Sequence, residues 1–180
     1  MFDERGYHAA RVDDIVRAAK ASHGTFYLYF SSKEDLFRAL FTDVTAEMIS
    51  VSASLPSIRP TRAGYDALRE WLERYYDVYR HYHPVLRAFT ETEAHELGLG
   101  RTGTESLVAF TNTLTKRMSE VDPSPVSDPA TAALAMVSMM DRMTFYTVTQ
   151  VVPVDDQVML DTMASILHVG LFGGSRRNRK

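Results

Sequence analysis

The sequence contains no cysteine and no long apolar run, and both absences restrict what the chain can do. Without cysteine it cannot form a disulfide framework, a zinc finger or a thiol nucleophile. Its longest nearly uncharged apolar run, residues 130–140, is much shorter than the roughly 20 residues that a membrane span needs. The amino terminus also lacks the basic and apolar regions of a signal peptide. We therefore expect a soluble, cytoplasmic protein without a membrane partner.

The chain also has little net charge. A formal charge of -3 gives no global attraction to nucleic acid, so any binding to phosphate must come from a local patch. One basic cluster, "RRNRK" at residues 176–180, ends the chain and is typical of a solvated tail. A hydrophobic content of 45% in 180 residues still allows a real core, in one large domain or two small ones.

The apolar residues recur at intervals of three and four, and no sustained period of two is present, so the pattern predicts an all-α fold. Ser31 or Ser32 is a cap for a helix from about residue 33, and Asp128 is a cap with Pro129 at the first helical position. Pro84 is expected to begin a new helix, because proline does not fit a helix interior. The expected helices are residues 12–19, 24–30, 33 to before Pro56, 62–82, 84 to the glycines at 98, 100 and 103, 104–121, 128–150, and from Asp155 to near "GLFGG" at residues 170–174. The expected domains are 1–46, 47–174 and a basic tail at 175–180. Residues 55–60, with their two prolines, separate the first helices from the longer helical patterns that follow.

Residues 22–30 place an unusual set of side chains on one helical element. On a helical wheel, Phe26, Phe30 and Tyr29 share an inward side, whereas His23, Gly24, Tyr27 and Leu28 point outward. The preceding helix lies one short turn away, which is the spacing of a helix-turn-helix, whose second helix enters the DNA major groove. The expected base-facing residues are His23, Gly24, Tyr27 and Leu28, and the expected phosphate contacts are Thr25, Tyr29 and Lys33.

The run "RVDDIVRAAKASHGTFYLYFSSKEDLF", residues 11–37, resembles the DNA-binding signature of the TetR family of bacterial transcriptional regulators. The resemblance covers roughly residues 4–44. It implies a homodimer with one helix-turn-helix per subunit on a palindromic double-stranded DNA operator, and a carboxy-terminal domain that binds a small-molecule effector. It also implies the same base-facing and phosphate-facing positions that the helical wheel gives.

Two features depart from the family pattern. Lys20 stands in the turn where the family usually has glycine, so the turn must close without a residue that tolerates positive φ. We expect the first helix of the family to be truncated here, because the chain begins near the end of that helix, before "ERGY". We expect that the native product starts upstream of Met1. The alternative is a helical dimeric ligand- or partner-binding module that no longer binds DNA.

The second part of the chain is expected to hold the effector and the dimer interface. The resemblance implies that helices from 62 to 121 form a ligand cage and that the last two helices form the interface. The methionine-rich helices from residue 130 onward suit either a core or a partner helix. The candidate pocket residues, which suit an ordinary aromatic core equally well, are Trp71, Tyr75, Tyr79, Phe89 and Phe110.

Enzyme and metal sites have little support in the sequence. His81 and His83 are two residues apart, so their rings diverge on a helix, and Glu91 and His95 have no third ligand at a telling spacing. No phosphate loop, nucleophile elbow or HExxH run is present. We therefore expect no catalysis, no metal and no cofactor. The expected function is a TetR-type repressor that a small, largely apolar effector releases from its operator; the sequence leaves the effector, the operator and repression versus activation open.

Overall fold

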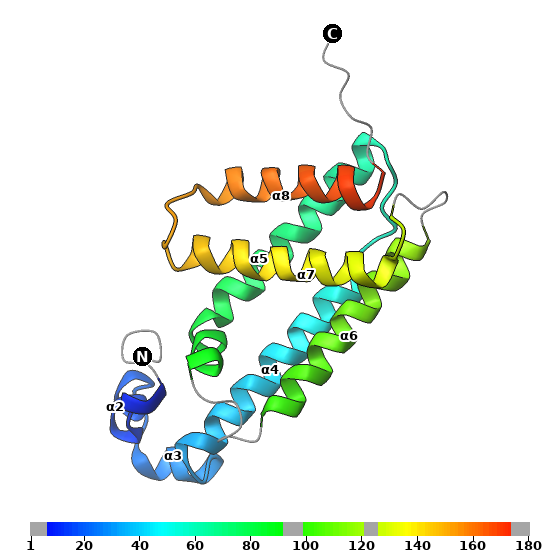
Figure 1. The fold of residues 1–180 in the computed structure, drawn as a ribbon. Helices are drawn as coiled ribbons and strands as arrows, with labels where there is room; N and C mark the ends of the chain where they lie inside the picture. Colours follow the sequence, from blue (N-terminus) through cyan, green and yellow to red (C-terminus); the bar gives the residue numbers. More distant parts are fainter. Residues whose placement is uncertain (1–6, 92–98, 121–125, 174–180) are drawn as a thin grey trace. The chain divides into compact units, whose positions relative to one another are not determined.

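The computed structural model describes residues 7–91, 99–120 and 126–173 of the chain. All regular secondary structure in these ranges is helical, which confirms the expected all-α fold. Figure 1 labels the helices, which are α2 (Val12–Ala18), α3 (His23–Tyr29), α4 (Lys33–Ala53), α5 (Arg62–Glu91), α6 (Gly100–Ser119), α7 (Pro129–Val148) and α8 (Asp156–Leu171).

Side-chain caps begin several of these helices where the sequence predicts them. Ser32 Oγ accepts a hydrogen bond from the Asp35 N–H at 3.2 Å at the start of α4. Asp128 accepts from the Thr131 N–H at 2.6 Å, with Pro129 as the first residue of α7. These bonds satisfy amide groups that have no partner inside the helix, and so they fix where each helix begins.

The expected break at Pro84 is wrong, because α5 runs without interruption from Arg62 to Glu91. Leu72 and Tyr79 before the proline and Val85 and Ala88 after it are all buried. Burial on both sides of Pro84 stabilises one continuous helix by more than the lost hydrogen bond costs.

The sequence also placed the start of the helix after the glycines too late. Helix α6 already begins at Gly100 and contains Gly103, whereas we expected a start near Thr104. A Cβ at position 103 would lie 2.9 Å from the Phe89 ring, so this glycine allows close packing within a helix instead of ending one. The helix start is thus set by packing that the local composition does not reveal.

The chain divides into two compact units. The first comprises residues 1–47 and 81–106, and the second comprises residues 48–80 and 107–180. Helices α4, α5 and α6 therefore contribute residues to both units. The domain boundaries expected from the sequence stay a prediction, and the basic tail at 176–180 lies outside the described residues.

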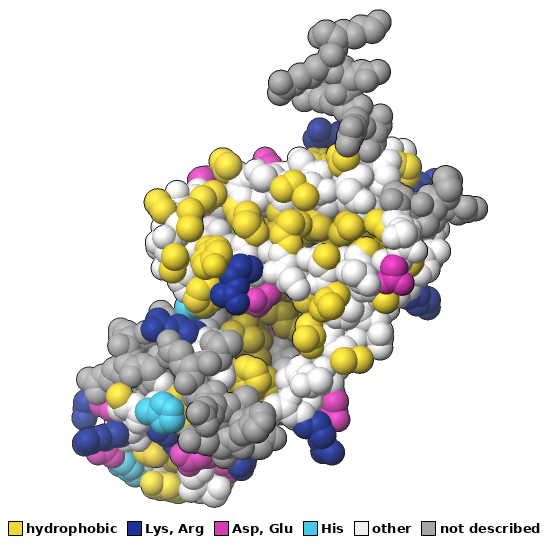
Figure 2. Space-filling view, in the orientation of Figure 1, with side chains coloured by type: hydrophobic (Ala, Val, Ile, Leu, Met, Phe, Trp, Pro, Cys, Tyr) yellow, Lys and Arg dark blue, Asp and Glu magenta, His cyan; other side chains and the backbone are white. Residues whose placement is uncertain are grey.

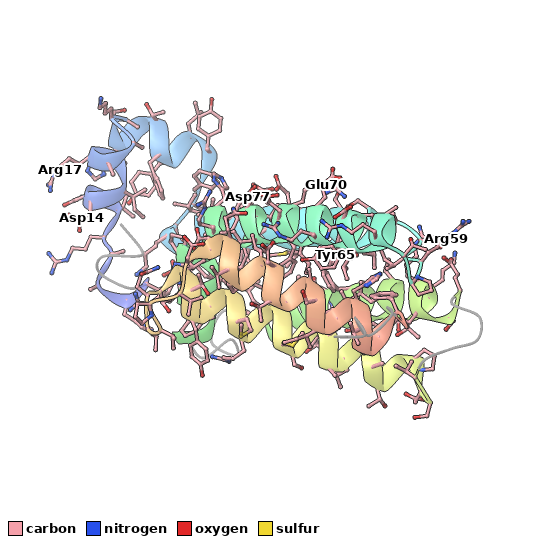
Figure 3. All side chains as sticks on the ribbon, turned by 90° about the horizontal axis from the view of Figure 1, so that it is seen from above. Asp14, Arg17, Arg59, Tyr65, Glu70 and Asp77 are labelled. Atoms are coloured by element: carbon pink, nitrogen blue, oxygen red, sulfur yellow. The ribbon has the colours of Figure 1, made fainter. Side chains whose placement is uncertain are left out.

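Helices α7 and α8 lie side by side in the second unit (Figure 1). The methionines at 136, 140, 159 and 163 are fully buried there, so part of each methionine-rich helix is core. Arg69 of α5 is held to Asp161 of α8 by a contact of 2.6 Å between Nε and Oδ1. At the other end of α8, the His168 ring packs edge-on against Tyr65 at 5.9 Å, and its Nε2 lies 2.9 Å from the Arg59 carbonyl oxygen (Figure 3 labels Arg59 and Tyr65).

No helix in residues 7–91, 99–120 or 126–173 is long and apolar enough to cross a membrane.

Candidate nucleic-acid interface

Helices α2 and α3 form a helix-turn-helix with a tight connection. The Ala19 N–H donates to the Ile15 carbonyl at 2.9 Å, and the Ala21 N–H donates to the Val16 carbonyl at 2.9 Å. Lys20 adopts a left-handed conformation with φ of 52°. The turn therefore needs a positive φ at this position even though the residue is not glycine, and the lysine bears the steric cost.

Ser22 starts α3 by accepting a hydrogen bond from the Thr25 N–H at 3.0 Å. Its Oγ also lies 2.9 Å from Thr25 Oγ1, so the two hydroxyl groups share a hydrogen bond at the surface. Helix α3 ends at Tyr29, and Phe30 follows in an extended conformation. The element is thus a two-turn helix with defined ends.

The outward side of α3 is open, as the helical wheel predicts. Phe26 is only 6% exposed, whereas Tyr27 is 57% and Leu28 is 76% exposed. His23 and Gly24 are exposed as well. Two large apolar side chains that face solvent on one short helix are typical of a contact surface.

The expected inward position of Tyr29 is wrong. Its side chain is 72% exposed, and Phe30 is only half-buried. Tyr29 is the last residue of α3 and the chain then leaves the helical path, so no neighbouring element among the described residues covers it. This exposure leaves its hydroxyl more accessible than the wheel suggests.

Lys33 has an additional role that the sequence did not reveal. Its Nζ donates to the Tyr7 carbonyl at 2.9 Å and to the His8 carbonyl at 3.5 Å, and it lies 4.3 Å above the Tyr7 ring. The Tyr7 ring packs against Phe37 at 4.9 Å between centroids. Lys33 thus ties helical residues 7–9 to the start of α4, and an ammonium group with three N–H donors still keeps one for another acceptor.

Glu34 belongs to the same cluster. The Tyr7 hydroxyl donates to its Oε1 at 3.3 Å. A hydrogen bond to its own backbone N–H, and then one from Ser32, lower the pKa of Glu34 below its ordinary value, with smaller help from Tyr7 and Lys33. The carboxylate is therefore ionised near neutral pH and supports the start of α4.

Asp13 of α2 reaches the outward side of α3, which the sequence did not suggest. Its Oδ1 lies 3.1 Å from His23 Nε2, and both side chains are exposed. The His23 ring stacks on Tyr27 at 6.4 Å between centroids, with an angle of 25° between the planes. Only the packing of α2 on α3 brings Asp13 next to His23, so no local pattern could have found this contact.

Four of the five candidate pocket aromatics form one buried cluster in the second unit. The Trp71 and Tyr75 rings stack at 6.3 Å, and Phe110 packs against Tyr75 at 6.0 Å. Tyr79 extends the cluster from Tyr75 at 6.1 Å. Phe89 lies in the first unit instead, where it stacks on Phe41 at 4.3 Å.

Two polar groups near this cluster were not expected from the sequence. Asp141 of α7 forms a hydrogen bond with Tyr79, and burial raises the pKa of its carboxyl group above the ordinary value. Thr144 Oγ1, one helical turn further on, is buried and has no hydrogen-bond partner among the described residues. In the sequence, the only sign of these two polar groups was their spacing of three residues, which places Asp141 and Thr144 on the same side of a methionine-rich helix.

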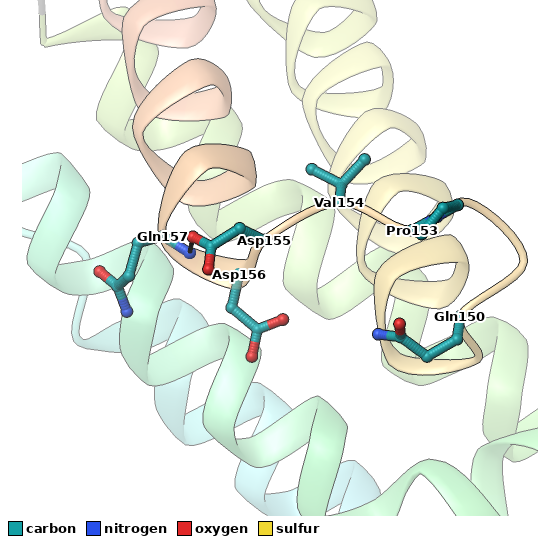
Figure 4. A pocket seen from close by; sticks show the side chains of 6 residues that line it. All are labelled: Gln150, Pro153, Val154, Asp155, Asp156 and Gln157. Atoms are coloured by element: carbon teal, nitrogen blue, oxygen red, sulfur yellow. Dashed lines mark hydrogen bonds between the residues drawn. The ribbon is translucent and has the colours of Figure 1, made fainter.

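An open hollow of about 590 Å³ lies at the connection between α7 and α8 (Figure 4), lined by Gln150, Pro153, Val154, Asp155, Asp156 and Gln157. Asp155 Oδ1 there accepts from the Gln157 N–H at 2.9 Å and from the Val158 N–H at 3.1 Å, which confirms it as the cap of α8. None of the expected pocket residues lines this hollow.

The expected separation of His81 and His83 is seen, because His81 is exposed and His83 is buried. The second pair that we considered, Glu91 and His95, lies outside the residues whose side chains are described.

The helix-turn-helix segment matches a known family of proteins. Residues 1–40 match the model of bacterial regulatory proteins of the tetR family. These residues belong to the TetR family. The match contains α2 and α3 together with the first part of α4.

Relatives of the TetR-family segment are regulators. An uncharacterised HTH-type transcriptional regulator of Bacillus subtilis, YdgC, is 43% identical over 54 residues, which are 30% of this chain and 28% of the relative. The fatty acid metabolism regulator protein of the same organism is 41% identical over 46 residues, 26% of this chain and 24% of the relative. The chain thus spans about a quarter of the length of these relatives.

Solved structures extend the similarity of fold beyond this segment. The TetR-family regulator PfmR from Thermus thermophilus matches with a TM-score of 0.68 at 19% identity, over 98% of this chain and 94% of PfmR. The flavonoid-responsive regulator FrrA matches with a TM-score of 0.50 at 26% identity, over 93% of this chain and 89% of FrrA. The first match shows that the helical fold following the TetR-family segment also occurs in a regulator of this family.

Proposed function

We propose that the chain is a TetR-type transcriptional regulator that binds a palindromic DNA operator as a homodimer. In this proposal it is a repressor, and a small, largely apolar effector releases it from DNA. The proposal rests mainly on one observation. The outward side of α3 is exposed to solvent, and α3 follows α2 through a tight turn held by backbone hydrogen bonds. The relatives of the TetR-family segment, which are named as transcriptional regulators, support it.

The residues of α3 suit contacts in a major groove. Tyr27 and His23 can donate or accept hydrogen bonds at base edges, and Leu28 can pack on a thymine methyl group. A Cβ at position 24 would meet the Ser22 hydroxyl at an ordinary distance of 3.6 Å. The glycine is therefore not needed for packing within the chain, and its lack of a side chain lets the helix backbone come close to the bases. We assign base contacts to these four residues.

Thr25, Tyr29 and Lys33 are proposed to contact phosphates beside them. Thr25 and Tyr29 present hydroxyl groups at the exposed surface. Lys33 is half-buried, and two carbonyl oxygens already accept from its ammonium group. Its third N–H can reach a phosphate while the other two hold the domain together.

The outer side of α7 and α8 supports a homodimer. Figure 2 shows hydrophobic side chains that gather over these two helices. On α8, Val158, Ile166 and Val169 are exposed and recur at intervals of eight and three, while Met159, Met163 and Leu167 face the core. A second copy of the chain can cover such a stripe in a two-fold interface, because the same surface then meets itself.

The aromatic cluster of the second unit supports an effector site. Trp71, Tyr75, Tyr79 and Phe110 present mainly apolar surface, and Trp71 already donates its Nε1–H to the Val51 carbonyl at 2.8 Å. Asp141 and the buried Thr144 hydroxyl add polar groups on the neighbouring helix. We therefore propose a largely apolar effector that also carries a hydrogen-bonding group.

The Tyr27→Ala variant tests DNA binding. DNA sequences are first selected with the wild-type chain from a pool of random duplexes, and affinities are then measured by fluorescence anisotropy. We expect the variant to bind the selected sequence about 10- to 100-fold more weakly, because a base contact is worth about 1–3 kcal/mol. Dimerisation and the thermal midpoint should not change, since Tyr27 is exposed.

Tyr29→Ala is the matched control on the same helix. It should weaken binding to all sequences to a similar extent, because a phosphate contact carries no base information. If the wild-type chain selects no DNA sequence, the proposed function is contradicted. If Tyr27→Ala binds with unchanged affinity, the assignment of Tyr27 to the base-contacting side of α3 is contradicted.

A further inference from the structure

A carboxylate lies on the surface that we propose to face DNA. Asp13 Oδ1 contacts His23 Nε2 at 3.1 Å, at the amino-terminal end of α3. The charge of an exposed aspartate repels phosphates, so its presence beside a base-reading residue is unfavourable for DNA binding in general. Its neighbour Asp14 differs, because it pairs with Arg17 on the same helix at 3.5 Å (Figure 3).

The Asp13 contact restricts the hydrogen-bonding state of the His23 ring. An ionised carboxylate only accepts hydrogen bonds, so the Nε2 atom that it contacts must carry the hydrogen. In the neutral ring, Nδ1 then has no hydrogen and becomes an acceptor. The stack on Tyr27 restrains the plane of the same ring.

We propose that Asp13 is a positioning residue that holds His23 as a hydrogen-bond acceptor and thereby makes it select a base with an amino group. This inference rests on the proposed function. In the major groove only adenine N6 and cytosine N4 donate hydrogen bonds, whereas guanine and thymine present acceptors to a side chain. A neutral His23 with an acceptor at Nδ1 therefore favours adenine or cytosine at the base that it meets.

The first test measures base preference. Bound sequences are selected from random duplexes with the wild-type chain and with the His23→Ala, Asp13→Asn and Asp14→Asn variants. The operator position whose preference is lost in His23→Ala is the one that His23 reads. At this position we expect the wild-type chain to favour adenine or cytosine at least about fivefold.

Asp13→Asn should reduce this preference to nearly equal use of the bases. An asparagine amide offers both an oxygen acceptor and an N–H donor, so it accommodates either form of the ring. Asp14→Asn removes the same charge from the same helix without touching the contact, and its base pattern should remain that of the wild type. A general change in affinity from a lost negative charge affects all DNA sequences alike, so it leaves the base pattern unchanged.

The second test needs no DNA. The ¹⁵N chemical shifts of the His23 ring, measured on the whole chain at about pH 8, report which ring nitrogen carries the hydrogen. We expect the hydrogen on Nε2 in the wild-type chain and a mixture of forms in Asp13→Asn. A ring with its hydrogen on Nδ1 in the wild type overturns the inference.

The outcomes separate the inference from the function on which it rests. An unchanged base pattern in Asp13→Asn, or a wild-type preference for guanine or thymine at the His23 position, overturns the role of Asp13 and leaves the regulator intact. Absence of DNA binding by the wild type and all variants overturns the proposed function, and the base selection with it.

Discussion

Lys20 stores backbone strain in the turn between α2 and α3. Its φ of 52° lies in the left-handed region, which costs a residue with a Cβ roughly 1–2 kcal/mol. Glycine adopts this conformation without the steric cost, although it loses more conformational entropy on folding. We expect Lys20→Gly to raise the free energy of unfolding by about 0.5–1 kcal/mol, measured by urea denaturation.

Lys20→Ala is the control for this prediction. It removes the same charge and the same long side chain but keeps the Cβ atom, so the strain remains and stability should not rise. Equal stabilisation by alanine and glycine would show that the lysine side chain, and not the backbone conformation, carries the cost.

At the scale of single residues, the sequence predicted contacts that depend on near neighbours. The burial of Phe26 and the exposure of Tyr27 and Leu28 follow from the helical period, and the structure confirms them. Tyr29 was placed on the wrong side, because the period does not show that the helix ends there. The contact of Asp13 with His23 depends on how two helices pack, which a wheel for one helix does not contain.

At the scale of elements, α5 contains a proline close to the position in the sequence at which the helix is divided between the two compact units. The division falls between Arg80 and His81, and Pro84 has no N–H to donate to the Arg80 carbonyl in the regular helical pattern. The helix is therefore weakened within one turn of this division.

We expect Pro84→Ala to stabilise the protein by about 1–3 kcal/mol in urea denaturation, because it restores a helical hydrogen bond and removes a clash. Pro129→Ala is the matched control: Pro129 occupies the first position of α7, where proline fits, so its replacement should give no gain. If both variants change stability equally, Pro84 does not strain α5.

The helix ends show what local sequence can predict about elements. The starts of α4, α7 and α8 were predictable, because Ser32, Asp128 and Asp155 satisfy amides a few residues away. The continuity of α5 and the early start of α6 were not, because both depend on burial by distant segments. The apolar stripe that continues across Pro84 was the signal that favoured one helix.

At the scale of the whole molecule, the proposed homodimer would link DNA binding to the exposed stripe of α8. In that proposal, two copies associate so that their two recognition helices reach successive major grooves, and the dimer binds both half-sites of a palindromic operator together. The helical fold could be predicted from periodicity alone. The sequence does not distinguish core from interface on these helices, since the same methionine-rich pattern suits either one.

Ile166→Glu tests the dimer, because Ile166 is 55% exposed in the middle of the α8 stripe and its change should leave the subunit folded. In a two-fold interface each copy contributes the substitution, so a cost of about 1.4 kcal/mol per glutamate would weaken the dimer about 100-fold. Sedimentation should show monomers at concentrations where the wild type is dimeric, and operator affinity should fall with dimerisation.

Val108→Glu, on α6 and 51% exposed, is the control and should remain dimeric. A dimeric Ile166→Glu chain would place the interface elsewhere, since a charge buried twice against apolar surface is not tolerated without a partner.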